Sequence, residues 1–271
     1  MPFLDLYEKP GLIAGHRGDR SHFPENTMAA FRGALGKCDF IETDIRLTRD
    51  LVPVILHDAT LKRTSNVADL PVFKRRKPWR VEDFTYEELR DIDFGGWFYE
   101  KDPFGTIRSG ETVPPPKEER YQPIPTLEEL LLFCKTHRLF VNLELKETGP
   151  EVSDEAFVEI VLSKIRETET AELVMLSSFR QAYLPLCKEA DPTLPTALLA
   201  DRPHTDLLAL LKRLRVDAWN PSRRIVRRKT VRMVREAGYF VNVYVVDDPK
   251  ERKKLFGWGV NALFTDRCPP G

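Results

Sequence analysis

Eight short apolar runs with the character of β-strands alternate with helix-like segments along this chain. The runs lie at residues 12–15, 40–47, 139–145, 173–177, 196–200, 216–219, 240–246 and 260–265. Two helix-like segments open with the capping-box pattern, a hydroxyl residue followed three positions later by Glu or Gln, at Thr126 and at Ser178. Strands that alternate with helices predict parallel β/α units, and eight such strands suit a closed barrel better than an open sheet. Residues 1–271 are therefore predicted to form a single (β/α)8 barrel, the TIM-barrel fold.

One segment, residues 59–124, interrupts this alternation of strands and helices after the second strand. It is rich in prolines and charged residues, and it holds one clear helix start, where Thr85 precedes Glu88. Insertions of this size in a compact domain usually form a lid, a substrate-binding cap or a disordered excursion. Because the segment follows His57, a candidate site residue, we predict an inserted cap subdomain. The chain ends at residue 271, soon after the last strand, so only seven regular outer helices are expected.

The overall charge and the cysteine pattern argue against several classes of protein. Lysines plus arginines and aspartates plus glutamates number 42 each, so no global positive field points to a nucleic-acid partner. The four cysteines lack a C-x-x-C spacing, which fits reduced thiols in a cytosol better than a disulfide framework. The opening residues carry acids and lack the apolar core of a signal peptide, and no apolar run approaches a membrane span. The sequence thus predicts a cytoplasmic protein without stable membrane insertion.

Two carboxylates occupy the second strand-like run, at Glu42 and Asp44. The period of two in a strand puts both on one face and leaves the apolar residues on the other. Their Cα atoms are then about 6.5–7 Å apart, so both side chains can reach one cation, which relieves their mutual repulsion. The alternative is a solvated strand with its polar face outward, but parallel strands covered by helices rarely have an all-polar outer face. We therefore favour a metal site.

The third run repeats this pattern, with Asn142, Glu144 and Lys146 on one face. Glu144 would supply a third carboxylate to the same site. Three carboxylates without a histidine cluster favour a hard cation that prefers oxygen ligands, Mg²⁺ or Ca²⁺, with Mn²⁺ as a further option. Lys146 has two roles open to it, because it can balance the charge of the acids or hold a substrate phosphate.

Two histidines follow strand-like runs, His16 beside Arg17 and His57 beside Asp58. A single histidine in such a place is more often structural than catalytic. A pair near a metal site can instead serve phosphoryl chemistry: one takes a proton from the attacking hydroxyl and the other donates one to the leaving alkoxide. Each transfer is worth about 10²- to 10⁴-fold in rate. Arg17 is expected to pair with phosphate oxygens.

These motifs, with several others, resemble those of the glycerophosphodiester phosphodiesterase family. The matching stretches, in the family's order, are Gly15-His-Arg-Gly18, Pro24-Glu-Asn-Thr27, Glu42-Thr-Asp44, Val54-Ile-Leu-His-Asp58, Ile124-Pro-Thr-Leu-Glu128, Asn142-Leu-Glu-Leu-Lys146 and Thr265-Asp266. The resemblance implies a (β/α)8 barrel whose insertion after the second strand is the family's cap. The site residues that it implies are the acid–base pair His16 and His57, the cation ligands Glu42, Asp44 and Glu144, and the phosphate contacts Arg17 and Lys146.

Two positions depart from that family's usual pattern. Leu51 follows Asp50 where the family favours glycine, and leucine tolerates a positive φ poorly, so the hairpin is expected to use a different turn. Tyr244 stands where many members have tryptophan, which makes it a candidate wall of the substrate pocket beside the glycerol. Its ring supplies an apolar face, and its hydroxyl can bond a polyol.

The combined expectation is a metal-dependent phosphodiesterase that hydrolyses small glycerophosphodiesters to sn-glycerol 3-phosphate and an alcohol. The attacking group is either water or the neighbouring glycerol hydroxyl, which would first form a cyclic phosphate, and the sequence leaves both open. A rival enzyme on the same scaffold is a lipid phosphodiesterase of lysophospholipase D or phosphoinositide type. A more remote alternative is a catalytically silent protein that binds metal or phosphodiester, which would not need both histidines.

Overall fold

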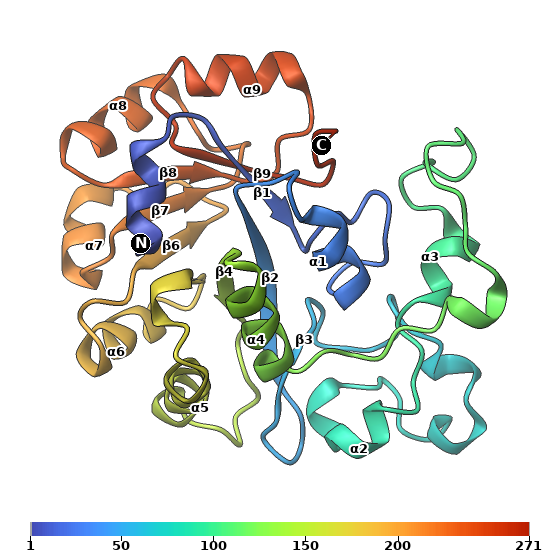
Figure 1. Ribbon diagram of the computed structural model, residues 1–271. Helices are drawn as coiled ribbons and strands as arrows, with labels where there is room; N and C mark the ends of the chain where they lie inside the picture. Colours follow the sequence, from blue (N-terminus) through green and yellow to red (C-terminus); the bar gives the residue numbers. More distant parts are fainter. Residues whose placement is uncertain (1, 271) are drawn as a thin grey trace.

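The computed structural model describes residues 2–270, and its centre is a closed sheet of eight parallel strands (Figure 1). Each strand pairs with the next one around the barrel, and β9 pairs back with β1, which closes the sheet. This arrangement confirms the predicted (β/α)8 barrel. The strands are β1 (Leu12–His16), β2 (Phe40–Leu47), β4 (Phe140–Leu145), β5 (Val174–Ser178), β6 (Thr196–Ala200), β7 (Ala218–Pro221), β8 (Phe240–Val243) and β9 (Ala262–Thr265).

Outer helices connect consecutive barrel strands. They are α1 (Met28–Ala34), α4 (Leu127–His137), α5 (Asp154–Thr168), α6 (Tyr183–Ala190), α7 (Leu207–Leu214), α8 (Arg228–Glu236) and α9 (Pro249–Phe256). Residues 266–270 after β9 form no helix, so the expectation of seven outer helices is confirmed for the described chain. No helix in residues 2–270 combines the length and the apolarity that a bilayer crossing requires.

The predicted helix starts had different outcomes. Thr126 and Thr85 each accept a hydrogen bond from the backbone of a glutamate three residues on, whose side chain bonds back, so both capping boxes are confirmed. The helix start predicted at Ser178 is wrong. Ser178 is the last residue of β5, its hydroxyl donates to the Leu145 carbonyl at 2.7 Å, and α6 begins only at Tyr183. The same hydroxyl accepts a hydrogen bond from the Arg180 amide at 3.0 Å, so it closes a turn two residues on and does not cap a helix.

A ninth strand, β3 (Pro53–Ile55), lies outside the barrel and pairs antiparallel with the end of β2. The expectation that the hairpin would avoid a positive φ at Leu51 is wrong, because this φ is 62°. The Thr48 hydroxyl accepts a hydrogen bond from the Val52 amide at 2.9 Å and donates to the Asp50 carboxylate at 2.6 Å. These bonds offset the strain of one left-handed residue, roughly 1–2 kcal/mol.

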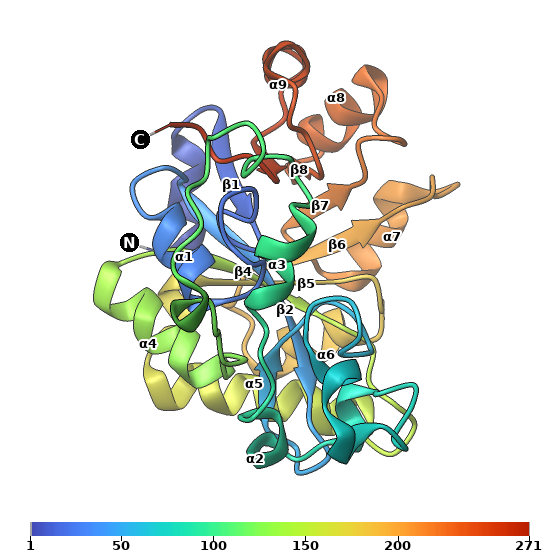
Figure 2. The ribbon, with the colours of Figure 1, turned by 90° about the vertical axis from the view of Figure 1, so that its right-hand side faces the viewer.

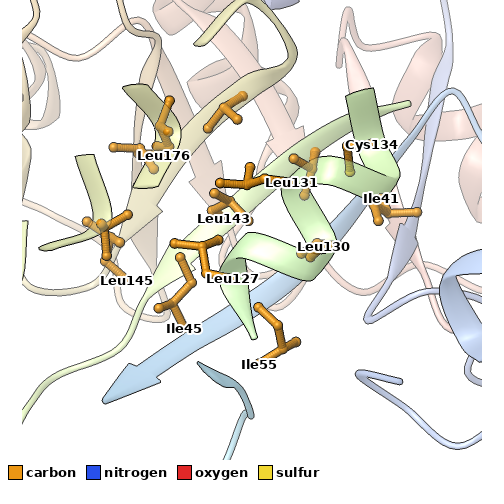
Figure 3. Packing of buried hydrophobic residues seen from close by; sticks show 14 of the residues in the cluster. Ile41, Ile45, Ile55, Leu127, Leu130, Leu131, Cys134, Leu143, Leu145 and Leu176 are labelled. Carbon is orange, nitrogen blue, oxygen red and sulfur yellow. The ribbon is translucent and has the colours of Figure 1, made fainter. Parts of the chain in front are cut away.

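The outward faces of the strands pack under the helices. Figure 3 shows α4 over β2 and β4, with Leu127 and Leu131 of the helix near Ile45 and Leu143 of the strands. All four side chains are fully buried. Each such burial contributes roughly 1.5–3 kcal/mol, so the register of these strands is strongly fixed. The alternate residues of the same strands must then point into the barrel.

A short 3₁₀ helix, η1 (Phe3–Glu8), closes the amino end of the barrel. Phe3 is fully buried and packs edge-to-face against Phe40 and Phe140, with ring centroids 5.3 and 5.8 Å apart. The Tyr7 hydroxyl accepts a hydrogen bond from Asn242 Nδ2 at 2.8 Å. These aromatic residues fill the lower barrel and leave the carboxyl end of the strands as the open end.

Residues 59–124 fold beside the carboxyl ends of the strands, where Figures 1 and 2 draw them from light blue to green. The segment has its own buried apolar cluster, which includes Phe73 and Phe84. The Thr106 hydroxyl donates to the Ser21 carbonyl at 2.7 Å, which joins the insertion to the loop after β1. Its elements are α2 (Tyr86–Leu89), α3 (Gly96–Lys101) and the 3₁₀ turns η2 (Val67–Asp69), η3 (Pro71–Phe73), η4 (Val81–Asp83) and η5 (Lys117–Glu119).

Candidate active site

The carboxyl ends of the barrel strands surround a cavity of about 260 Å³. Each residue predicted for the site lines this cavity, with the exception of Asp44, which is fully buried next to it. The structure therefore brings together residues from widely separated positions in the sequence. The lining residues are His16, Arg17, Glu42, His57, Asn142, Glu144, Lys146, Phe179, Leu199, Asp201, Tyr244, Val245 and Phe264.

Three carboxylates form a compact cluster inside the barrel. Asp44 is paired with Glu144 across β2 and β4, and Glu42 precedes Asp44 by two residues on the same face. One oxygen from each side chain lies within 4.8 Å of the others. All three side chains are buried, so the alternative of a solvated, outward-facing strand is wrong.

Burial and mutual repulsion act on the protonation of these acids. Burial raises the pKa of Glu42 well above its usual value, and the negative charges of Asp44 and Glu144 raise it further. Burial also raises the pKa of Glu144 to about 7, although Lys146 opposes the shift. At Asp44, burial is outweighed by the positive charges of Lys146 and Arg17, which lower the pKa. For Glu42 and Glu144, the nearby positive charges do not offset the burial and repulsion that raise the pKa.

The donor set of this cluster fits a hard divalent cation. Asp44 Oδ1 is buried, and the Lys146 ammonium, whose Nζ lies 2.9 Å away, is its charged neighbour. Asp44 Oδ2 accepts a hydrogen bond from Asn26 Nδ2 at 2.9 Å, and the Thr43 hydroxyl orients that amide by donating to its oxygen at 2.8 Å. Carboxylates that converge, with an outer partner holding one of them, are the usual setting for Mg²⁺, Ca²⁺ or Mn²⁺.

The two predicted phosphate contacts lie at the edge of the carboxylate cluster. Lys146 Nζ lies 2.9 Å from Asp44 Oδ1 and 2.5 Å from Glu144 Oε1. Of its two possible roles, the ion pairs seen here correspond to balancing the charge of the acids. Arg17 Nε lies 3.5 Å from Asp44 Oδ2, and the φ of Arg17 is 58°. Both cations also line the cavity, where an anionic ligand can meet them.

His16, at the end of β1, is oriented by a carboxylate from the other end of the chain. Its Nδ1 lies 2.5 Å from Asp266 Oδ1, which assigns the proton to Nδ1 and leaves Nε2 free. Nε2 lies 3.8 Å from Glu42 Oε2, beside the carboxylate cluster. Burial, and then the charge of Arg17, lowers the pKa of His16 to about 4. The imidazole is therefore neutral near neutral pH.

His57 repeats this arrangement after β3. Its Nδ1 lies 2.6 Å from Asp58 Oδ1, and Arg63 Nε donates to Asp58 Oδ2, also at 2.6 Å. Burial lowers the pKa of His57 as well. Its side chain is 33% exposed, against 12% for His16, so solvent reaches it more readily. Each histidine thus has an anchored Nδ1 and a free Nε2.

Glu25 connects the supports of the two histidines. This carboxylate is 5% exposed and accepts hydrogen bonds from Arg17 at 2.7 Å, from Arg63 at 2.7 and 3.0 Å, and from Arg20. Arg63 and Arg20 also bind the carboxylate partners of the two histidines. Burial opposes the charge on Glu25, but the three arginines outweigh it and lower the pKa.

The opposite wall of the cavity is more apolar. Phe179, Leu199 and Phe264 contribute side chains from β5, β6 and β9 or the loops that follow them. Tyr244 follows β8, and its hydroxyl donates to Asp201 Oδ1 at 2.8 Å. The rings of Tyr244 and Phe179 meet edge-to-face with centroids 6.2 Å apart. This wall offers an apolar surface with one hydroxyl and one carboxylate.

Sequence reasoning assigned no role to three of these residues. Asp58 and Asp266 orient the histidines, and Glu25 holds the arginines. A signal existed for each, since Asp58 directly follows His57 and the other two belong to the motifs Thr265-Asp266 and Pro24-Glu-Asn-Thr27. An acid next to a histidine, or directly after a strand, could have been proposed as a histidine partner.

Comparison with known proteins gives a consistent result. The profile of the Glycerophosphoryl diester phosphodiesterase family matches residues 16–269. A glycerophosphodiester phosphodiesterase of Bacillus altitudinis is 30% identical over 259 residues, covering 94% of each chain. A glycerophosphoinositol inositolphosphodiesterase of Mus musculus is 39% identical over 150 residues, 54% of this chain and 26% of that protein. The solved structure of an Oleispira antarctica phosphodiesterase in complex with the product sn-glycerol-3-phosphate has a similar fold, with a TM-score of 0.80, 22% identity, and coverage of 97% of this chain and 96% of that one.

Proposed function

Because the chain belongs to the glycerophosphoryl diester phosphodiesterase family, whose enzymes are phosphoric diester hydrolases, we propose that it hydrolyses small glycerophosphodiesters to sn-glycerol 3-phosphate and an alcohol. The observation that supports this most is the position of two carboxylate-anchored histidines, His16 and His57, beside three clustered carboxylates in one cavity. A silent binding protein would not need two oriented histidines.

The acid cluster would hold one divalent cation through Glu42, Asp44 and Glu144, either Mg²⁺ or Ca²⁺, with Mn²⁺ as a further option. When bound, the cation would polarise the phosphoryl oxygen. Arg17 and Lys146 would hold the remaining phosphate oxygens from the rim of the cluster. The insertion 59–124 would act as a cap.

The histidines would move protons at their Nε2 atoms. One accepts the proton of the attacking oxygen as the new phosphorus–oxygen bond forms, and the other donates a proton to the alcohol oxygen as its bond to phosphorus breaks. Both pKa values are lowered, so both rings start neutral near neutral pH. A phosphodiester anion beside them favours protonation of one ring, which then serves as the acid. Water or the neighbouring glycerol hydroxyl can be the attacking group in this scheme.

The decisive experiment measures glycerol 3-phosphate released from glycerophosphocholine and glycerophosphoethanolamine with a coupled dehydrogenase. Parallel reactions contain Mg²⁺, Ca²⁺, Mn²⁺ or a chelator. We expect release that the chelator abolishes and one of the ions restores. Absence of release with every ion would overturn the proposed substrate class. Release that persists in the presence of chelator would overturn the proposed requirement for a divalent cation.

Glycerophosphoinositol is a second candidate substrate, because the partial match to the mouse enzyme concerns that diester. The Tyr244 hydroxyl and the Asp201 carboxylate on the apolar wall can both bond a polyol. The products distinguish the reactions: inositol phosphate with free glycerol indicates cleavage on the glycerol side, and glycerol 3-phosphate with free inositol indicates the first proposal. Preferential hydrolysis of lysophospholipid vesicles would instead indicate the lipid-directed rival.

A further inference from the structure

Two cysteines that are distant in the sequence meet beside β1. Cys38, in the loop between α1 and β2, has its Sγ 2.9 Å from Sγ of Cys268, which follows β9. The two positions are separated by 230 residues. Cys268 is buried and Cys38 is half-buried, so a small oxidant can reach the pair through Cys38.

The other two cysteines provide an internal contrast. Cys134 and Cys187 are fully buried on α4 and α6 among apolar side chains. Burial raises the pKa of each to about 12, which keeps both as unreactive thiols. Within residues 2–270, only Cys38 and Cys268 have their sulfur atoms within hydrogen-bonding distance of each other.

Gly15 makes room for this pair. A Cβ atom at position 15 would lie 3.3 Å from both sulfur atoms and 3.3 Å from the Gly18 carbonyl oxygen. The two sulfurs therefore rest on the backbone of the residue that precedes His16. A bond between the two cysteines would therefore also restrict the backbone at Gly15, next to His16 of the candidate site.

We propose that Cys38 and Cys268 are an oxidative modification site that closes to a disulfide on exposure to a small disulfide such as oxidised glutathione. The two thiols are oxidised, and the small disulfide is reduced to two thiols, so that two protons and two electrons pass to it in total. The sulfur atoms need only approach from 2.9 Å to the bonded distance of about 2.05 Å. In a reducing cytosol, the location that we propose from the sequence, the pair would remain as thiols.

Cys38 is the first thiol to react in this scheme. The hydrogen bond with Cys38, and then burial, raise the pKa of Cys268, so the more exposed Cys38 attacks the small disulfide. Once Cys38 is held in a mixed disulfide, its thiol no longer raises the pKa of Cys268. Cys268 then attacks the mixed disulfide, forms the Cys38–Cys268 bond and releases the second small thiol.

The bond would fix the segment that orients His16. Asp266 lies two residues before Cys268, and its carboxylate contacts His16 Nδ1. Non-covalent contacts hold this segment now, such as the hydrogen bond at 2.9 Å from Arg252 to the Arg267 carbonyl. A cross-link would make that attachment covalent. The effect on catalysis rests on the proposed function, whereas the cross-link itself does not.

The chemical test uses the full chain, treated with oxidised glutathione or with dithiothreitol, then alkylated and mapped by mass spectrometry. We expect Cys38 and Cys268 to lose alkylation together, about ten times faster than the two buried cysteines, and to appear as one linked peptide pair. The C134S/C187S variant should form the same link, and C38S/C268S should form none. A stable glutathione adduct on Cys38 without the link, or equal oxidation of all four thiols, overturns the proposal.

A second test measures the consequence of the bond. The backbone amides of residues 266–268 in the oxidised protein should exchange their hydrogens more slowly, and the melting temperature should rise by several degrees, because the bond closes a very long loop. Dithiothreitol should reverse both effects. A linked protein whose hydrogen exchange and melting are unchanged would overturn the role in holding the Asp266 segment. Neither readout depends on turnover, so an inactive protein would refute the proposed function without affecting this inference.

Discussion

The two walls of the cavity differ in how their side chains are held. On the wall formed by β1, β2 and β4, a network of hydrogen bonds runs from His57 through Asp58, Arg63 and Glu25 to Arg17. On the wall formed by β5, β6, β8 and β9, Tyr244 has one hydrogen bond and ring contact with Phe179, which is 40% exposed.

The two walls meet different requirements: fixed geometry for the groups that react or bind a cation, and simple contact for the groups that meet the rest of the substrate. Groups that move protons or bind a cation must hold one geometry, and redundant bonds supply that rigidity. Groups that only contact the substrate can be replaced at a small cost. We therefore expect substitutions on the charged wall to have large effects and substitutions on the apolar wall to have small ones.

The largest expected effect is loss of a histidine. His16→Ala and His57→Ala should each lower kcat by about 10²- to 10⁴-fold, because each removes one proton transfer. His137→Ala, an exposed histidine at the end of α4, is the control and should leave kcat unchanged. Steady-state kinetics with glycerophosphocholine measures the effect. Near-normal turnover in either site variant would remove that histidine from the mechanism.

The next effect concerns the cation. Glu144→Gln removes one charge from the acid cluster and should weaken cation binding by more than the roughly 10- to 100-fold that loss of an outer partner costs. Isothermal titration with Ca²⁺ or Mn²⁺ measures this without turnover. Glu147→Gln, an exposed neighbour on the same segment, is the matched control. Equal affinities in the two variants would contradict the assignment of Glu144 as a ligand.

A third prediction concerns the stability of the charged wall. Glu25→Gln should lower the free energy of unfolding by about 3 kcal/mol at neutral pH, because three arginines lose their shared buried partner. The pKa of Glu25 is lowered by folding, so its contribution is complete above the unfolded value near 4.3 and declines as the pH falls below it. Urea unfolding of both proteins at several pH values measures the difference. A gap that stays constant below about pH 4 would show that the charge of Glu25 is not the cause.

The smallest effect is expected on the apolar wall. Tyr244→Phe removes the hydrogen bond to Asp201 but keeps the ring against Phe179, so kcat/KM should fall by less than about tenfold. Kinetics with glycerophosphocholine and glycerophosphoinositol should show the larger loss for the diester whose polyol meets the hydroxyl. A loss as large as that of His57→Ala would erase the difference between the walls.

Site residues that share one strand could be predicted from the sequence. Contacts between residues that meet only when the barrel closes could not. Glu42 and Asp44 share one strand, so the period of two was enough to place them together. Asp266 orients His16 across 250 positions, and only the closure of β9 against β1 brings them together. The capping-box pattern at Ser178 starts no helix, because its hydroxyl closes a turn at Arg180 and donates to Leu145 of the neighbouring strand β4.

The position of the inserted segment was predictable, but its internal form was not. The capping box at Thr85 identified α2, whereas the remaining short turns depend on packing around residues such as Phe73 and Phe84. The positive φ of Leu51 shows the same limit, since bonds through Thr48 outweigh the preference of leucine. Local propensity decides an element only where tertiary contacts agree with it.

Phe3, Phe40 and Phe140 pack across the amino end of the barrel, so among the described residues the acid cluster faces solvent at the carboxyl ends of the strands. Under the proposed function, the product leaves through the same opening by which the diester enters. Accumulated glycerol 3-phosphate should therefore inhibit by competing with the diester for the cavity.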